Sequence, residues 1–162
     1  QTAIMVNRPN SDKTEANMEH RITGRLARFN QLWKQMDEIY HQYAKKHRIS
    51  DMTLWLLYSL YQNSAAFTQR ELCAEWHYPP QTVNSALKNL ERQGYVRLES
   101  VSGNRKNKLV VLTEEGKELT QAMIAPLVQA EQNAFGGMEE TEAETLLSLI
   151  EAYVELLQST VD

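Results

Sequence analysis

The sequence has few residues that could support disulfide, thiolate-metal or membrane chemistry. It contains one cysteine, Cys73, in 162 residues, so an internal disulfide and a multi-thiolate cluster within one chain are excluded. No stretch approaches the ~20 uninterrupted apolar residues of a membrane helix, and the N-terminus lacks the charged-then-apolar plan of a signal peptide. We therefore expect a cytoplasmic globular protein, in which Cys73 is a buried structural thiol.

Motifs that carry catalysis or bind cofactors are also missing. The chain has neither a glycine-rich phosphate loop nor a nucleophile-elbow motif, and its carboxylates fall on expected outer helix faces. The nearest two of the four histidines are six residues apart, a spacing that does not suit a metal on one helix turn; zinc bound across a dimer stays open. We predict no enzyme activity, no cofactor and no metal site.

Basic residues are scarce in the last third of the chain. Residues 113–162 hold one Lys or Arg against eleven Asp and Glu, whereas residues 67–112 hold seven against four. The net charge of -4 therefore conceals a cationic middle segment. Because fields are screened beyond ~8 to 10 Å, this segment could meet phosphate although the whole chain is acidic.

The first part of the chain is expected to form a tail and two helices. Residues 1–18 are polar, contain Pro9 and show no period, which predicts a mobile tail. From about His20 to His47 apolar residues recur at steps of three and four, so we expect one long amphipathic helix, followed by a shorter one capped near Ser50. Residues 19–63 are then dimerisation and support helices, because a helix this long cannot bury its stripe against a small subdomain alone.

Residues 64–116 are predicted to contain two short helices and a hairpin. In "FTQREL", Thr68 precedes Glu71 by three residues, a capping box for a helix that ends near Trp76. Pro80 suits the first position of the next helix, which Gly94 ends. The runs "YVRLES" and "KLVVLT" around "VSGNRKN" then indicate two strands joined by a basic tip.

Residues 117–162 are predicted to form C-terminal dimerisation helices. Thr113 caps a helix that passes Pro126, where we expect a kink, and runs to about Phe135. Gly136 and the glycine after it break the helix, and the last helix runs from about residue 140 to residue 158.

Together these elements predict a mainly α winged helix-turn-helix fold with a two-stranded β wing and long N- and C-terminal dimerisation helices. In such a fold the second short helix, about residues 80–93, enters the major groove of DNA and the wing, about residues 97–111, approaches the backbone or minor groove. The amides and hydroxyls on this helix can pair with bases, and the cations with guanine or phosphate. The expected DNA-binding residues are Thr68, Gln69, Arg70, Gln81, Thr82, Asn84, Ser85, Lys88, Asn89, Arg92, Arg105, Lys106 and Lys108.

The motifs "FTQREL", "TVNSALKNLERQGYV" and "NRKNKLVVLTEEG" resemble those of MarR-family transcriptional regulators. The resemblance covers about residues 20–158 and implies a homodimer that binds a pseudo-palindromic operator, most often as a repressor relieved by a small molecule. Two positions depart from the family pattern: Ser85 stands where an arginine is frequent, and "VSGN" replaces the Asp-x-Arg of the wing, so that Gly103 or the shifted Arg105 takes the place of the usual arginine.

The resemblance also implies an effector pocket between the first helices and the winged region, where an aromatic or phenolic ligand would bind. The same side chains could instead serve only as core and dimer interface. The candidates are Trp33, Met36, Tyr40, Tyr43, Trp55 and Tyr58. As an alternative function, the winged helix could be a protein-interaction module whose acidic C-terminal segment suits a basic protein partner.

Overall fold

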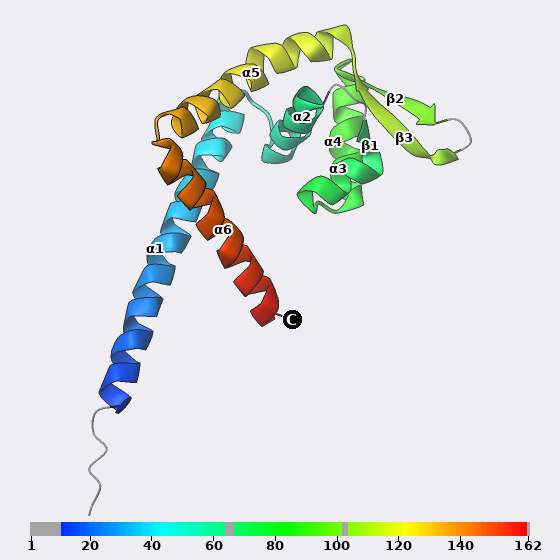
Figure 1. Cartoon of the computed structure of the whole chain (residues 1–162). Helices are drawn as coiled ribbons and strands as arrows, with labels where there is room; N and C mark the ends of the chain where they lie inside the picture. Colours follow the sequence, from blue (N-terminus) through cyan, green and yellow to red (C-terminus); the bar gives the residue numbers. More distant parts are fainter. Residues whose placement is uncertain (1–10, 64–66, 102–103, 162) are drawn as a thin grey trace, which may run out of the picture. The chain divides into compact units, whose positions relative to one another are not determined.

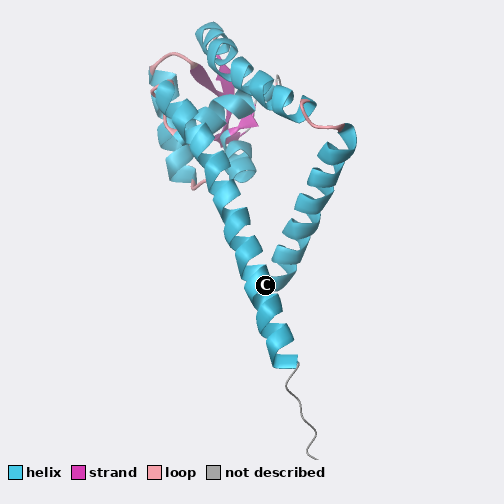
Figure 2. Ribbon diagram, turned by 90° about the vertical axis from the view of Figure 1, so that its left-hand side faces the viewer, coloured by secondary structure: helices cyan, strands magenta, loops and turns pink. Residues whose placement is uncertain are grey.

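The computed structural model describes residues 11–63, 67–101 and 104–161, and the chain divides into two compact units, residues 1–51 and 52–162. Each unit is considered by itself. The chain is mainly helical, and its strands gather in one small sheet (Figure 2).

The first unit consists of one long helix and the turn that follows it. Helix α1 runs from Ser11 to Lys46, so it begins nine residues before the expected start, and residues 11–18 of the predicted tail are helical. The segment before residue 20 lacks an apolar stripe, but Pro9 precedes the helix and neither Pro nor Gly interrupts residues 11–23. Because extending an existing helix costs less than starting one, good helix formers continue it without tertiary contacts.

The second unit has its hydrophobic core in the predicted winged region. Its elements are α2 (Asp51–Gln62), β1 (Phe67–Thr68), α3 (Gln69–Trp76), α4 (Pro80–Arg92), β2 (Val96–Val101) and β3 (Asn104–Leu112). Side chains from each of these helices and from the β2–β3 hairpin are fully or almost fully buried, among them Leu54, Leu57, Leu72, Val83, Leu87, Leu90, Val96 and Val110. This core fixes α3 and α4 relative to the sheet (Figure 1).

The sheet has three strands rather than the two expected. The order is β1-β3-β2, with both pairings antiparallel, and Phe67 lies opposite Val110. A two-residue strand leaves no alternation in the sequence, so only its pairing with β3 could reveal it. The second wing strand is also longer than predicted, because β3 begins at Asn104, within the expected tip. The first wing strand, β2, has the predicted length but lies one residue later, and the ladder is irregular between Ser100 and Val101.

Two helices complete the second unit. Helix α5 runs from Glu114 to Gly136 and continues through Pro126, and α6 runs from Glu140 to Val161, three residues beyond the expected end. None of the α6 residues, all of which the structure describes, is buried. Helix α6 therefore presents its apolar residues Leu146, Leu149, Ile150, Tyr153, Val154 and Leu157 to the surface.

Candidate nucleic-acid interface

The capping box at the start of α3 is present in full. The Thr68 hydroxyl accepts from the Glu71 amide at 3.2 Å and donates to the Glu71 carboxylate at 2.8 Å, and the Thr68 amide donates to the same carboxylate at 2.6 Å. These hydrogen bonds lower the pKa of Glu71. Thr68 is therefore engaged in holding the helix start, while Arg70 is exposed on the first turn and Gln69 is half-buried.

The turn between α3 and α4 depends on an uncommon backbone conformation. His77 has φ 52°, in the left-handed region, and its amide donates to the Ala74 carbonyl at 3.4 Å. Pro79 then supplies no side-chain cap, and its carbonyl accepts from the amides of Thr82 and Val83. The turn directs the chain from α3 into α4 within three residues.

Helix α4 separates apolar from polar side chains as the sequence predicts. Val83, Leu87 and Leu90, at spacings of four and three, are buried at the second unit's core. The residues expected to face DNA lie outside it: Asn84 is half-buried, and Gln81, Thr82, Ser85, Lys88, Asn89 and Arg92 are exposed. The helix thus presents amides near its N-terminus and cations further along.

Two side-chain hydrogen bonds on α4 restrict what its outer residues can donate. The Ser85 hydroxyl donates to the Gln81 carbonyl at 2.9 Å, so Ser85 offers an approaching ligand its oxygen as an acceptor. The Arg92 guanidinium donates to the Asn89 side-chain oxygen at 2.6 Å, which orients the cation at the helix end. The side chains of Gln81, Asn84 and Lys88 take part in neither of these two bonds.

The end of α4 is joined to the start of α5. Gly94, with φ 81°, and Tyr95 donate their amides to the Glu91 and Leu90 carbonyls at 3.0 Å, which closes the helix. The Thr113 hydroxyl caps α5 by accepting from the Gly116 amide, and it donates to the Gly94 carbonyl at 2.5 Å. These bonds connect the end of α4 directly to the start of α5.

Gly116 makes that junction possible. A Cβ at this position would lie 1.9 Å from the Tyr95 carbonyl oxygen, so no other residue fits without moving the backbone. Inspection of the sequence did not single out Gly116, because a glycine in the first turn of a helix has several ordinary explanations. Only the approach of a segment 21 residues earlier in the sequence reveals its role.

The wing carries part of the expected basic set. Lys108 is exposed on β3, and Arg105 and Lys106 belong to the same strand, although their side chains lie outside the described set. On β2, Arg97 donates to the Glu99 carboxylate at 3.0 Å across the exposed face. The predicted cations of the wing therefore lie on β3, which is the central strand of the sheet and pairs with both β1 and β2.

An aromatic cluster links α2, α3 and α5. Trp55 stacks on Trp76 with ring centroids 4.8 Å apart, and the Trp76 indole donates to the buried Ser59 hydroxyl at 2.6 Å. The Tyr58 hydroxyl donates to the Glu131 carboxylate at 2.5 Å. Trp76 and Glu131 were not predicted as site residues from the sequence. Each contacts a residue far from it in the sequence, so no local sequence pattern could indicate the contact.

The candidate effector residues are distributed over both units. On α1, Trp33 and Met36 are 59% and 50% exposed, whereas Tyr40 and Tyr43 are half-buried. Trp55 and Tyr58 are half-buried in the second unit. Within one unit the structure therefore brings together Trp55 and Tyr58, which meet edge to face at 5.7 Å.

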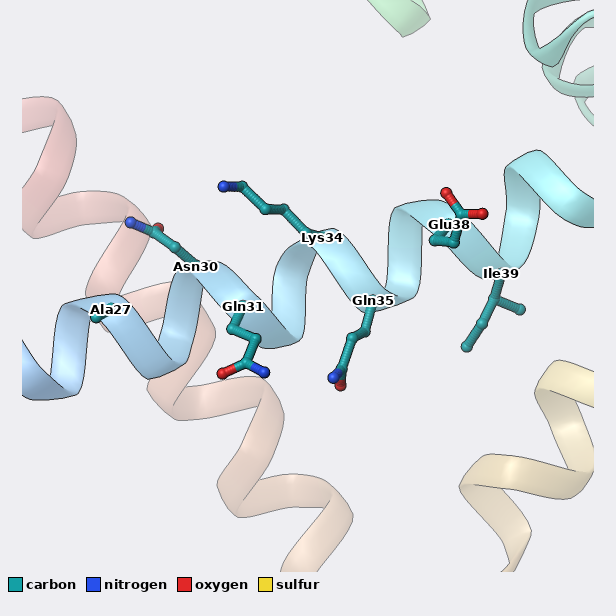
Figure 3. A pocket seen from close by; sticks show the side chains of 7 residues that line it. All are labelled: Ala27, Asn30, Gln31, Lys34, Gln35, Glu38 and Ile39. Carbon is teal, nitrogen blue, oxygen red and sulfur yellow. The ribbon is translucent and has the colours of Figure 1, made fainter.

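Two shallow hollows lie along the surface of α1. Neither is lined by any of the six candidate effector residues. The larger one is lined by Ala27, Asn30, Gln31, Lys34, Gln35, Glu38 and Ile39. In Figure 3, Gln31 and Gln35 project from one side of the helix and Asn30 and Lys34 from the other. Such diverging side chains do not form a set that could surround a small molecule.

Cys73 and the acidic residues give no sign of redox or metal chemistry. The thiol is half-buried rather than buried as expected, and desolvation raises its pKa, which disfavours the reactive thiolate. Among the described residues, no group of three His, Cys, Asp or Glu side chains could hold a metal ion.

Three comparisons bear on this arrangement. The family model described as MarR family matches residues 49–106. The uncharacterized HTH-type transcriptional regulator YwhA of Bacillus subtilis is 25% identical over 140 residues, which cover 86% of this chain and 94% of YwhA. The chain is therefore similar to transcriptional regulators of the MarR family.

Solved structures agree with this MarR-family fold. The regulator NMB1585 from Neisseria meningitidis matches with a TM-score of 0.71 and 20% identity, over 85% of this chain and 96% of NMB1585. MepR of S. aureus, in a complex with DNA, matches with a TM-score of 0.64 and 23% identity, over 80% of this chain and 94% of MepR. The predicted mainly α winged-helix fold is thereby confirmed.

The similarity to the MarR family also bears on the class of the protein. MarR-family proteins are transcriptional regulators, in agreement with the prediction that this chain is not an enzyme. Within the part of the chain that the structure describes, no helix is both long enough and apolar enough to cross a membrane.

Proposed function

We propose that this MarR-family chain acts as a homodimer that binds a pseudo-palindromic operator through α4 and the β2–β3 wing. The observation that supports the proposal most directly is that α4 has two different faces. Its apolar residues are buried, while Gln81, Asn84 and Lys88 face outward beside a cationic wing. Phosphate contacts would come from Arg70, Arg92 and Lys108, with the remaining predicted residues around them. The DNA-bound structure of MepR, which shares the fold, supports this mode of binding.

The exposed apolar faces of the long helices support the homodimer. Large apolar side chains on α1 are between 37% and 66% exposed, and those on α6 between 37% and 75%. Apolar surface of this extent on a monomer indicates an interface. A two-fold dimer would place two α4 helices ~34 Å apart, the distance between successive major grooves on one side of DNA. Operator DNA also implies a cytoplasmic location.

We further propose that the protein is a repressor whose DNA affinity is lowered by an aromatic or phenolic effector. The support is the set of half-buried aromatic side chains, of which Trp55 and Tyr58 meet in the second unit near the carboxylate of Glu131. Aromatic surface with a few polar groups suits such ligands. The effector would act by binding the conformation that cannot engage DNA more tightly than the one that can.

The experiment that tests the DNA-binding proposal is a selection from random DNA duplexes with the purified protein at two salt concentrations. We expect enrichment of an inverted repeat with half-sites about one helical turn apart. Its affinity should fall steeply with salt, with a log-log slope of about -0.9 for each neutralised phosphate. If no sequence is enriched at either salt concentration, with or without aromatic compounds, operator binding is wrong.

A protein-interaction module is the second candidate, and the acidic C-terminal segment favours it. Residues 113–162 carry eleven Asp and Glu against one Lys or Arg, so this segment could attract a basic partner. Failure of the DNA selection together with salt-sensitive capture of a basic protein would support this candidate.

A further inference from the structure

The residues that end α4 are also bonded to the start of α5. The amides of Gly94 and Tyr95 donate to carbonyls of the last turns of α4 at 3.0 Å, which ends that helix. The carbonyls of the same two residues accept from Thr113, which caps α5. The Thr113 hydroxyl donates to the Gly94 carbonyl at 2.5 Å, and the Thr113 amide donates to the Tyr95 carbonyl at 3.1 Å. Gly94 and Tyr95 therefore contact both helices.

A single peptide group carries one bond to each helix. The Gly94 carbonyl and the Tyr95 amide belong to the same peptide group, which is planar and nearly rigid. Its amide is bonded to α4, and its carbonyl is bonded to the Thr113 hydroxyl. A change in the angle between α4 and α5 would therefore strain or break one of these two bonds.

The Thr113 hydroxyl makes two separable bonds. Its oxygen accepts from the Gly116 amide at 3.0 Å, which caps α5, while its proton is donated to the Gly94 carbonyl. A hydroxyl can do both, because it has one donor and two acceptor lone pairs. A carboxylate would also cap a helix but has no proton to donate. The residue type at position 113 therefore decides whether the bond to Gly94 forms, independently of the cap.

Helix α5 is attached to the second unit along its length. One side of the helix is buried from the first turn onward, at Gly116, Thr120, Met123 and Leu127. Further along, Glu131 accepts from the hydroxyl of Tyr58 on α2 at 2.5 Å. Figure 1 shows α5 starting at the base of the wing, where β3 ends. The bonds of Thr113 thus hold the end of α5 that is joined to α4.

We propose that Thr113 is a positioning residue for DNA binding, which holds α4 at a fixed angle to α5 through the peptide group between Gly94 and Tyr95. This inference rests on the homodimer and the operator of the proposed function. In that dimer, α5 would connect each α4 to the segment that dimerises, so the angle between α4 and α5 would set the separation of the two α4 helices. A fixed separation restricts binding to half-sites at one spacing.

The test measures how strictly each protein selects the spacing between half-sites. The probes are duplexes that carry the enriched inverted repeat, either unchanged or with one base pair added or removed between the half-sites. One added base pair moves a half-site by ~3.4 Å along the DNA and rotates it by ~35° about the axis. Spacing discrimination is the Kd for an altered duplex divided by the Kd for the unchanged one. For the wild-type protein it should be at least ~10, since base contacts of one α4 are then lost.

Thr113→Asp separates the bond to Gly94 from the cap. The carboxylate can accept from the Gly116 amide, but it cannot donate to the Gly94 carbonyl. We expect spacing discrimination to fall about fivefold, which corresponds to one lost hydrogen bond, while the base preference within each half-site is unchanged. Thr113→Ser keeps both the donor and the acceptor, so it should retain the discrimination of the wild-type protein.

Two controls separate this effect from added charge and from reduced stability. Thr113→Asp combined with Glu114→Gln has the wild-type net charge and should behave as Thr113→Asp alone. Thr120→Val removes a hydroxyl that donates to the Lys117 carbonyl within α5, so it should lower stability without changing spacing discrimination. Urea denaturation of each variant would measure its stability.

Thr113→Val keeps the test valid if Thr113→Asp does not fold. It removes both bonds of the hydroxyl and is compared with Thr120→Val, the same substitution on the same helix. Reduced spacing discrimination in Thr113→Val alone would support the proposal. Wild-type discrimination in both valine variants would contradict it.

Three further results would overturn the inference. If Thr113→Asp retains wild-type discrimination, the bond to Gly94 does not position α4. If Thr113→Ser loses discrimination as well, the hydroxyl is not the cause. If Thr120→Val has as large an effect as Thr113→Asp, reduced stability explains both. Failure of the proposed function would be distinct from these results, because the wild-type protein itself would then enrich no inverted repeat.

Discussion

The winged region and the two long helices α1 and α6 differ in how far their apolar side chains are buried within one chain. In the winged region Leu72, Val83 and Leu87 are completely buried within one chain. On α6 no residue is buried, and Ile150 is 43% exposed although it lies on a continuous apolar face. The winged region therefore buries its apolar residues within one chain, whereas the apolar faces of the long helices are left for the second copy of the proposed homodimer.

The two regions also differ in what their polar side chains do. On α4 the exposed amides and cations are available to a ligand, while local hydrogen bonds such as Arg92–Asn89 orient them. On α6 the exposed carboxylates have no basic residue in the same helix to pair with.

The winged region should be most sensitive at Gly116. Gly116→Ala should lower the free energy of unfolding by about 2 to 4 kcal/mol, since the added Cβ would overlap the Tyr95 carbonyl and force the backbone apart. Urea denaturation would measure the loss. The matched control is Gly24→Ala on α1, where a Cβ meets nothing within 4 Å, and which should be neutral or stabilising by about 0.5 to 1 kcal/mol. Equal effects at both glycines would contradict the tight junction.

The outer residues of α4 and the wing should affect DNA binding rather than folding. Asn84→Ala should cost about 1 to 3 kcal/mol of discrimination at particular base pairs, whereas Lys88→Ala and Arg105→Ala should each reduce the salt slope by about one unit. Fluorescence anisotropy with the selected operator and single-base variants would separate these effects. Unchanged affinity in all three would remove α4 and the wing from the interface.

The capping box should have a smaller and pH-dependent effect. Thr68→Ala should destabilise the fold by about 1 kcal/mol at neutral pH. Because the Thr68 hydrogen bonds lower the pKa of Glu71, their stabilisation is complete above the unfolded pKa of Glu71 and is lost as pH falls through the lowered folded value. Urea midpoints between pH 3 and pH 7 would measure it. The control is Thr23→Ala within α1, whose effect on stability should not depend on pH in this range.

The smallest effect is expected in the first unit, at the pair formed by His41 and Asp51. The His41 ring nitrogen lies 3.0 Å from the Asp51 carboxylate, and this hydrogen bond raises the pKa of His41 above 6.5. The stabilisation is therefore complete below pH 6.5 and disappears as pH rises through the raised value. His41→Gln should remove this pH dependence from the thermal unfolding of the full chain, while the control His20→Gln should retain it.

The sequence predicted most of the elements that have a local signal. The Thr68 capping box, Pro80 at a helix start and the glycine after α4 each placed a boundary, because each acts on backbone within a few residues. The start of α1 and strand β1 were missed, because a polar helix extension and a two-residue strand have no period to detect.

As with the fold, the sequence predicted the candidate site in part. The outward set on α4 followed from the spacing of Val83, Leu87 and Leu90, whose burial the structure confirms. The internal bonds of Ser85 and Arg92 could not be read from the sequence, since each residue had several possible partners.

The order of the helices, the polar face of α4 and the separation of charge along the chain could be predicted from the sequence, because these depend on residue type and spacing. The tertiary structure was needed to show that β1 pairs with β3, that the Tyr95 carbonyl lies against Gly116, and that Trp76 and Glu131 contact residues of α2. Each of these is a contact between segments distant in sequence, which no local pattern specifies.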